Sequence, residues 1–180
     1  MSLRSPLGAV LGHGAAHSGV QLRLDRSGGV TAFCGATEVG QGSDDVLALC
    51  VAEVLGIEAD GVSVWAADTD MTPLDVGAYA DSTTYISGMA VKKAADAVRD
   101  RIVLRAARLL DVEDAGDIDL RDHRAWAPDG RSVSLEDVAL HALHLEDQEQ
   151  IMATASHVSG ESPPPFAAQV AEIEVDVDTG

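Results

Sequence analysis

Two apolar stripes with helical spacing alternate along the chain with strand-like stretches, and this order limits the possible folds more than any other feature. One stripe lies in residues 43–55 and the other in the long segment that follows Thr84. Apolar residues at positions i, i+3, i+4 and i+7 form one helix face, which must pack against another element. Residues 19–26, 30–33 and 62–66 have the alternation or the apolar run of strands. The predicted fold class is therefore α+β, a mixed sheet with packed helices.

The composition determines what core can cover these stripes and which partners are excluded. Of the 180 residues, 46% are hydrophobic but only 3% are aromatic, so the core must be built from Ala, Val, Leu and Ile. A chain of this length and hydrophobicity has enough apolar surface for one domain, and its composition argues against disorder. The formal net charge of −18 repels phosphate groups and anionic membranes, so nucleic-acid and membrane partners are excluded.

The cysteines and the N-terminal residues favour a cytoplasmic protein. Cys34 and Cys50 form no CxxC pair and belong to no Cys/His cluster with metal-ligand spacing, so we predict free, buried thiols. Residues 1–4 lack the apolar run of a signal peptide. The chain also has no stretch near the roughly 20 apolar residues that a membrane span requires.

The C-terminal part predicts a strand whose partner is missing. Residues 167–177 alternate strongly between apolar and polar side chains, as in a half-buried strand. The Asp176–Gly180 sequence has hairpin-turn composition, and a hairpin turn calls for a return strand. We therefore expect residues 1–180 to be a fragment of a larger subunit. Before this part, we predict a strand at 123–127 and a helix capped by Ser134.

The first candidate binding element is Gly40-Gln41-Gly42, which opens the helix at 43–55. Glycines let the backbone approach a ligand closely, and a helix N-terminus favours an anion or a carbonyl-rich ring. The Gln41 side chain offers both a donor and an acceptor, which suits the edge of a heterocycle. An ordinary glycine turn before a helix is the alternative interpretation.

The second candidate is the small, hydroxyl-rich segment 77–84, which leads into the long helix. Its hydroxyls at Ser82, Thr83 and Thr84 are suited to donate to phosphate or pterin oxygens. Helix capping by serine or threonine is the alternative.

Two further groups of polar residues are weaker candidates. His141 and His144 have i, i+3 spacing, but a helical wheel turns both away from the apolar stripe, so we predict surface histidines and no metal site. Asp68 and Asp70 follow a strand, where loop capping is the expected role rather than a catalytic carboxylate pair.

Five motifs in a fixed order carry a family resemblance that covers roughly residue 18 to the end of the chain. They are Thr37–Ser43 (TEVGQGS), Val51–Ile57 (VAEVLGI), Asp68–Pro73 (DTDMTP), Thr84–Val91 (TYISGMAV) and Gln169–Asp176 (QVAEIEVD). Together they resemble the molybdopterin-binding region of the xanthine dehydrogenase/aldehyde oxidase family, the molybdenum hydroxylases. The Thr-Pro-Leu-Asp-Val-Gly-Ala-Tyr sequence that begins at Thr72 is most similar to bacterial xanthine dehydrogenases and to 4-hydroxybenzoyl-CoA reductases.

This resemblance implies an oxidoreductase subunit that binds the molybdenum cofactor, molybdopterin, sometimes in a dinucleotide form. Its usual partners are an FAD-binding and a [2Fe–2S]-binding subunit or domain. Such enzymes hydroxylate an aldehyde or N-heterocycle with oxygen from water, whereas the branch similar to 4-hydroxybenzoyl-CoA reductase reductively dehydroxylates an aryl-CoA. The family's catalytic glutamate lies downstream of the strand at Gln169, and Glu161 precedes that strand, so Glu161 does not match it. The chain alone is therefore expected to be inactive, without a catalytic residue of its own.

The resemblance assigns cofactor contacts to five positions. Gly40, Gln41 and Gly42 match the Gly-Gln-Gly that touches the pterin, and Asp81 and Thr83 lie where many members direct hydroxyl side chains toward the cofactor. Many bacterial members have Ser-Arg where this chain has Asp-Ser, so a cation is lost and a carboxylate gained. A like charge at ~4 Å from a pyrophosphate costs about 1 kcal/mol in water and more in a drier site. Together with the charge of −18, this departure favours the rival hypothesis, a non-catalytic binding or scaffold domain without cofactor.

Overall fold

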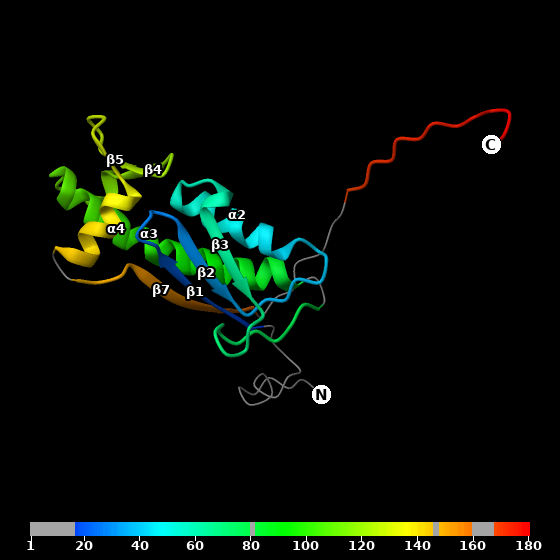
Figure 1. Ribbon diagram of the computed structural model, residues 1–180, viewed down its shortest axis with the longest axis horizontal. Coiled ribbons are helices and arrows are strands. Elements are labelled where there is room, and N and C mark those ends of the chain that lie inside the picture. Colours follow the sequence, from blue (N-terminus) through cyan, green and yellow to red (C-terminus); the bar gives the residue numbers. More distant parts are fainter. Residues whose placement is uncertain (1–16, 80–81, 146–147, 160–167) are drawn as a thin grey trace.

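A four-stranded mixed sheet forms the centre of the molecule, and two helices cover one of its faces (Figure 1). The computed structural model describes residues 17–79, 82–145, 148–159 and 168–180. The strand order is β3-β2-β1-β7; β2 and β3 are parallel, and the other neighbours are antiparallel. The strand bounds are His17–Leu24 for β1, Val30–Cys34 for β2, Val62–Ala66 for β3 and Met152–Val158 for β7. The predicted class, α+β with a mixed sheet and packed helices, is confirmed.

The strands β1 and β2 form the predicted hairpin, with Leu22 opposite Ala32. Alternate side chains of each strand are buried toward the helices, as the period of two requires. On the other face, Arg23 lies over the Phe33 ring, and its guanidinium pairs with Asp25 at 3.0 Å. The sheet therefore has one apolar face under the helices and one more polar face.

The two predicted helical stripes pack on the apolar face of the sheet. Helix α2 spans Ser43–Leu55 and helix α3 spans Gly88–Leu110. Gly56 ends α2 in the left-handed conformation with φ 64°, and a Cβ there would lie 2.1 Å from the Leu120 carbonyl oxygen. The buried face of α3 is made of small and medium aliphatic side chains, among them Val91, Ala94, Ala95, Val98, Ile102 and Ala106.

A small second sheet and helix α4 lie at one end of the molecule (Figure 1). The sheet consists of β4 (Asp119–Arg121), β5 (Arg124–Trp126) and β6 (Ser132–Ser134), and helix α4 (Leu135–His144) follows it. The Ser134 hydroxyl accepts a hydrogen bond from the Asp137 N–H at 3.0 Å, which confirms the predicted cap. Three short helical turns complete the fold, the 3-10 turns Ala59–Gly61 and Ala115–Asp117 and the π-turn Thr83–Ser87.

Two strand predictions need correction. Strand β7 was not predicted from the sequence, because its inward positions at Ala153 and Ala155 are too small to stand out as an apolar stripe. Conversely, the strand predicted at 167–177 does not form over residues 168–177, since none of the described residues pairs with it. A strand needs a partner for its backbone groups, and Val170 and Ile173 are correspondingly exposed. The turn after it is present, with the Gly180 N–H donating to the Asp176 carbonyl at 2.7 Å.

Both thiols are free, as predicted, although only Cys34 is fully buried and Cys50 is half-buried. Burial raises the pKa of Cys34 to about 12, with smaller effects from the carboxylates of Asp44 and Asp75. Cys34 is therefore an unreactive core residue at neutral pH. Over the described ranges, no helix is long and apolar enough to cross a membrane.

Candidate functional site

Both candidate loops lie at one edge of the central sheet. Because β2 and β3 are parallel, their carboxyl ends share this edge, and the loops at 35–42 and 67–79 leave the sheet there (Figure 1). Helix α3 also begins at this end of the molecule, directly after the π-turn. The topology therefore brings together three segments that the sequence analysis treated separately.

Contacts around the end of β2 show how close these segments are. Besides burial, the carboxylates of Asp44, on α2, and Asp75, in the second loop, are near enough to raise the pKa of the Cys34 thiol. Gly35, the next residue, approaches the second loop so closely that a Cβ would lie 2.3 Å from the Pro73 carbonyl oxygen. Gly19 on β1 makes a similar approach and donates its N–H to the Leu74 carbonyl at 3.0 Å. The loop at 67–79 thus packs against the ends of β1 and β2.

The first loop has the glycine conformations that its sequence predicts. Gly40 has φ 97° and Gly42 has φ 73°, in the left-handed region that side chains with a Cβ disfavour. A Cβ at either position would have no heavy atom of the described chain within 4 Å. The two glycines are therefore required by the backbone conformation of the free loop and not by crowding within it.

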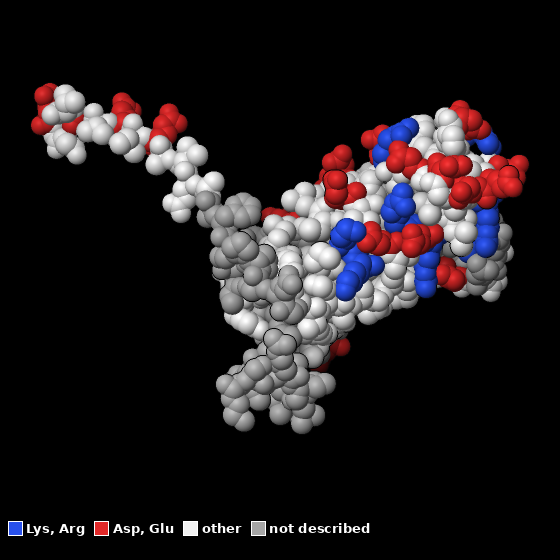
Figure 2. Space-filling view, turned by 180° about the vertical axis from the view of Figure 1, so that it is seen from behind, with Lys and Arg blue, Asp and Glu red and all other residues white. Residues whose placement is uncertain are grey.

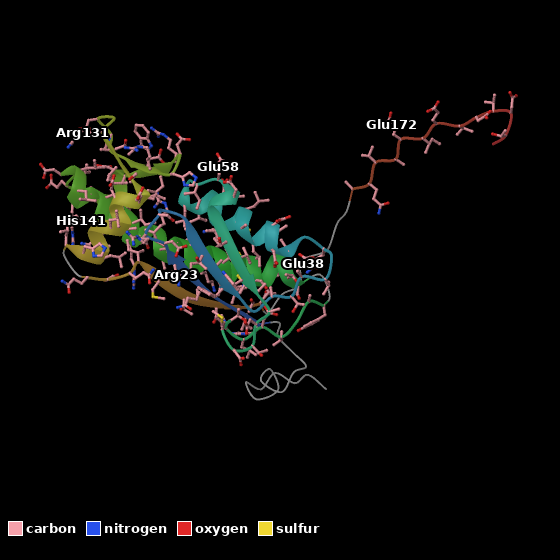
Figure 3. All side chains as sticks on the ribbon, in the orientation of Figure 1. Arg23, Glu38, Glu58, Arg131, His141 and Glu172 are labelled. Carbon is pink, nitrogen blue, oxygen red and sulfur yellow. The ribbon has the colours of Figure 1, made fainter. Side chains whose placement is uncertain are left out.

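The carboxylate of Glu38 is the centre of the first loop. Its Oε1 accepts from the N–H groups of Gly40 at 2.5 Å and Gly42 at 3.2 Å. Its Oε2 accepts from the Ser43 hydroxyl at 3.2 Å and the Asp44 N–H at 3.4 Å. Figure 3 shows Glu38 where α2 begins, at the end of the molecule opposite His141 and Arg131.

This environment strongly favours the ionised form of Glu38. Desolvation acts to raise its pKa, but the backbone N–H donors and the Ser43 hydroxyl outweigh it and lower the pKa from 4.5 to about 2. The pKa of Asp44 is raised, mainly by the desolvation of its carboxyl group and next by the charge of Glu38. The N-terminus of α2 is therefore occupied by a carboxylate from its own chain.

Gln41 bonds to its own loop. Its Oε1 accepts from the Val39 N–H at 2.6 Å, and its Nε2 donates to the Thr37 carbonyl at 2.9 Å. Both groups that we expected to read a heterocycle are partly engaged, although the residue is exposed. The second hydrogen of Nε2 has no partner among the residues described, so Gln41 can still offer one donor outward.

The second loop is organised by Asp75 and not by the predicted hydroxyls. Its Oδ1 accepts from the Gly77 N–H at 2.8 Å and its Oδ2 from the Ser87 hydroxyl at 3.2 Å, which links the loop to the start of α3. Thr83 begins the π-turn, and the Ser82 side chain makes no cap to the described residues. Helix capping by that serine is therefore not the role of the motif. Asp81 lies outside the described residues.

An apolar groove of about 720 Å³ lies between α2 and the segment formed by the π-turn and the start of α3. Its lining includes Val46, Cys50 and Val54 from α2, Tyr85 from the π-turn and Met89 from the start of α3. Figure 2 shows this helix-covered side of the molecule from behind: charged side chains gather toward the β4–β6 end, and the surface toward the loops is mostly uncharged. On this face, the charged side chains are thus unevenly distributed.

Of the weaker candidates, Asp68 caps its own loop, and the two histidines lie away from the site. The Asp68 side chain accepts from the Asp70 N–H at 2.9 Å, which confirms a loop-capping role. His141 and His144 lie in the last turn of α4, far from the loops; His144 is exposed as predicted, whereas His141 is half-buried and its Nδ1 has no hydrogen-bond partner among the described residues. In the part of the chain that the structure describes, no group of three or more His, Cys, Asp or Glu residues is placed to hold a metal ion. Glu161 lies outside the described residues.

Two carboxylates, Glu38 in the first loop and Asp75 in the second, each accept several hydrogen bonds and are called the carboxylate hubs. Neither was predicted from the sequence. Glu38 had a local signal, since it precedes the two glycines within one short loop and lies five residues before a helix N-terminus that favours negative charge. Asp75 had none, because its partner Ser87 is twelve residues away and the π-turn between them was not predicted. The predicted Gly40, Gln41 and Gly42 lie together in the first loop, with Thr83 in the neighbouring segment.

The chain belongs to the family of molybdopterin cofactor-binding domains, whose family model matches residues 4–180. It is 32% identical over 164 residues to a putative xanthine dehydrogenase molybdenum-binding subunit of Escherichia coli, covering 89% of this chain and 22% of that protein. It is 30% identical over 166 residues to the gamma subunit of the 6-hydroxypseudooxynicotine dehydrogenase complex of Paenarthrobacter nicotinovorans, covering 88% and 21%. The chain thus spans about a fifth of the length of these relatives.

A solved structure supports the same assignment. Quinoline 2-oxidoreductase from Pseudomonas putida 86 superimposes with a TM-score of 0.70 at 28% identity, covering 79% of this chain and 19% of that one. The fold and the family are therefore those expected from the five sequence motifs.

Proposed function

We propose that this chain forms one part of a molybdopterin site in the large subunit of a molybdenum hydroxylase. The observation that carries the proposal is the meeting of two motif-bearing loops at the carboxyl edge of β2 and β3, in a chain of the molybdopterin cofactor-binding family. Gly40, Gln41 and Gly42 are the proposed contacts from the first loop, and Asp81 and Thr83 are the proposed contacts from the segment that follows the second loop in the sequence and leads into α3.

The first loop fits an uncharged, polar ring system. Its backbone is held in an exposed arch by the two positive-φ glycines, and Gln41 at its tip keeps one outward amide hydrogen. A pterin has a planar edge of ring nitrogens and a carbonyl oxygen, which match such donors and the neighbouring backbone carbonyls. When bound, the cofactor supplies the redox centre, and the residues of this chain bind and orient it.

We propose hydroxylation of an aldehyde or N-heterocycle as the activity of the whole subunit, with reductive dehydroxylation of an aryl-CoA as the variant. Relatives named for xanthine and for a nicotine derivative support a heterocyclic substrate. Electron transfer then calls for FAD-binding and [2Fe–2S]-binding subunits or domains. Residues 1–180, as a part of the domain, hold cofactor contacts without the catalytic glutamate, so we expect no activity from them alone.

A non-catalytic scaffold domain is the second candidate. The observation in its favour is the number of acidic side chains near the loops. Glu38 contributes to the raised pKa of Asp44, and Asp75 contributes to the raised pKa of the buried Cys34. A site surrounded by carboxylates disfavours an anionic cofactor. The two candidates differ in whether the full-length protein retains molybdenum.

Elemental analysis of the full-length protein tests the proposal. About one molybdenum per chain is expected after expression with available cofactor, and a fully matured protein without molybdenum would support the scaffold. Gln41→Ala should lower retention after dialysis about tenfold, since one hydrogen bond in a dry site is worth roughly that factor. Gln148→Ala, which changes an exposed glutamine in the segment after α4 and outside the five motifs, is the matched control and should retain the cofactor.

A further inference from the structure

The donors that would receive an anion at the start of α2 are already used within the chain. Free backbone N–H groups at a helix N-terminus commonly bind phosphate. Here the N–H groups of Gly40, Gly42 and Asp44 all donate to Glu38. The Ser43 hydroxyl, the side-chain donor in the same place, also donates to it. One carboxylate thus takes the place that a phosphate would take.

We infer that Glu38 is a positioning residue of the first loop. Its carboxylate holds this loop in the conformation that binds the cofactor, and it occupies the N–H groups at the start of α2. The uncharged part of the cofactor therefore lies against the loop, and the phosphate of the cofactor lies elsewhere. This inference rests on the proposed function for its ligand. The contacts of Glu38 within the loop exist without any ligand.

The bonds of Gln41 complete the arrangement. Glu38 draws the N–H groups of Gly40 and Gly42 inward, while Gln41 reaches back over the same turn to Val39 and Thr37. Together the two side chains bond to five backbone groups between Thr37 and Asp44. A loop fixed in this way loses little further entropy when it binds a ligand, which is the advantage of preorganisation.

Charge excludes a phosphate from the same place. A phosphate oxygen that bound these N–H groups would lie within hydrogen-bond distance of atoms that already contact Glu38, next to Asp44 and Asp45 of the first turn. At such separations like charges repel strongly unless water screens them. The low pKa of Glu38 means that protonation does not relieve this repulsion at neutral pH. Uncharged donors and acceptors meet no such penalty.

Amide hydrogen exchange on the 180-residue chain without cofactor tests the positioning role. In Glu38→Ala and Glu38→Gln, exchange at Gly40, Gly42 and Asp44 should become about tenfold faster, because the charged acceptor is lost. Asp45→Asn removes the same charge from the same helix turn, where Asp45 is exposed, and should leave these rates unchanged. Unchanged rates in both Glu38 variants would overturn the inference, whatever the cofactor does.

Inorganic phosphate tests the second half of the inference. Titrated into the wild-type chain, phosphate should not shift the amide resonances of Gly40, Gly42 and Asp44, whereas Glu38→Ala should show saturable shifts there. Saturable binding at these amides in the wild type would overturn the claim that Glu38 reserves them, and so would a Glu38→Ala chain that shows no phosphate binding at them.

Cofactor retention in the full-length protein separates this inference from the proposed function. Glu38→Ala should lower molybdenum content, and Glu38→Asp, which restores a carboxylate, should recover part of it. Faster exchange in the isolated chain with full molybdenum content in Glu38→Ala would keep the loop-holding role and overturn the role toward cofactor. A wild-type protein without molybdenum, with faster exchange in the variants, would overturn the proposed function alone.

Discussion

The loops before α2 and α3 lie at the same edge of the sheet, yet they are held in different ways. The loop before α2 is closed by Glu38 through contacts no more than six residues apart in sequence. The segment before α3 depends on Asp75, which reaches Ser87 twelve residues away and sits in a loop packed against Gly19 and Gly35. The first loop is therefore a local structure, and the second needs the tertiary fold.

This difference suggests that the two loops have different roles in the site. A locally closed loop keeps its shape when its surroundings change, which suits a fixed contact with a rigid ring. A segment held by distant contacts can shift with the packing of its neighbours, and the π-turn at Thr83–Ser87 is a further irregularity of the kind found at functional positions. Variants that disturb one loop should leave the other intact.

The largest expected effect comes from filling the close approach under the second loop. Gly35→Ala would place a Cβ 2.3 Å from the Pro73 carbonyl oxygen, so the loop at 67–79 must move. We expect the free energy of unfolding to fall by about 2 kcal/mol, as for overpacking elsewhere. Urea denaturation measures it. Amide protection at Gly40 and Gly42 should persist under native conditions, and its loss would show that the loops are not independent.

A smaller effect is expected from the Asp75 hub. Asp75→Ala removes the acceptor of the Gly77 N–H and the Ser87 hydroxyl and should cost about 1–2 kcal/mol. Ser87→Ala should cost less, because only one bond is lost. A double-mutant cycle by urea denaturation should give a coupling energy of about 0.5–1 kcal/mol between the two side chains. Strict additivity would argue that this bond does not anchor the segment.

Replacing the glycine at each helix start with alanine should change the free energy of unfolding in opposite directions. Gly42 has φ 73°, so Gly42→Ala should destabilise the protein by about 1 kcal/mol. Gly88 has φ −60°, and its added Cβ would meet only the Cys50 sulfur at 4.0 Å among the described atoms. Gly88→Ala should therefore stabilise by about 0.5–1 kcal/mol through helix propensity. Thermal melts of both variants provide the measurement, and equal signs would refute the distinction.

The smallest expected effect is a pH dependence confined to the first loop. The pKa of Glu38 is lowered from 4.5 to about 2 on folding, so its contribution to stability is present above pH 4.5 and is lost as the pH falls toward 2. Urea midpoints across this range should fall less steeply in Glu38→Gln than in the wild type. Asp45→Asn should follow the wild type. Parallel wild-type and Glu38→Gln profiles would contradict a depressed pKa at Glu38.

Much of the fold was predictable from local patterns. The bounds of α2 and β3, the buried stripe of α3 and the Ser134 cap follow from apolar periodicity and capping chemistry within short windows. Strand β7 was missed because its inward alanines carry little hydrophobic signal. The parallel pairing of β2 with β3 joins strands separated by a helix, and it is this pairing that assembles the site.

The site itself was predictable only in part. The glycine loop was found by its motif, but the bonds of Gln41 to the Val39 N–H and the Thr37 carbonyl were not predicted from the sequence. Glu38, Asp44 and Asp45 all lie near the start of α2, and the sequence does not show which of them accepts from the N–H groups of the loop. Asp75 and Ser87 meet through tertiary packing, for which the spacing of the motifs holds no information.

The most direct test is a crystal structure of the full-length protein loaded with its cofactor. In that structure, the pterin edge should lie against Gln41, and the Glu38 carboxylate should still accept from the N–H groups of Gly40 and Gly42. A cofactor phosphate on these N–H groups with Glu38 turned away would contradict it, and so would a bound cofactor that makes no contact with the Gly40–Gly42 loop.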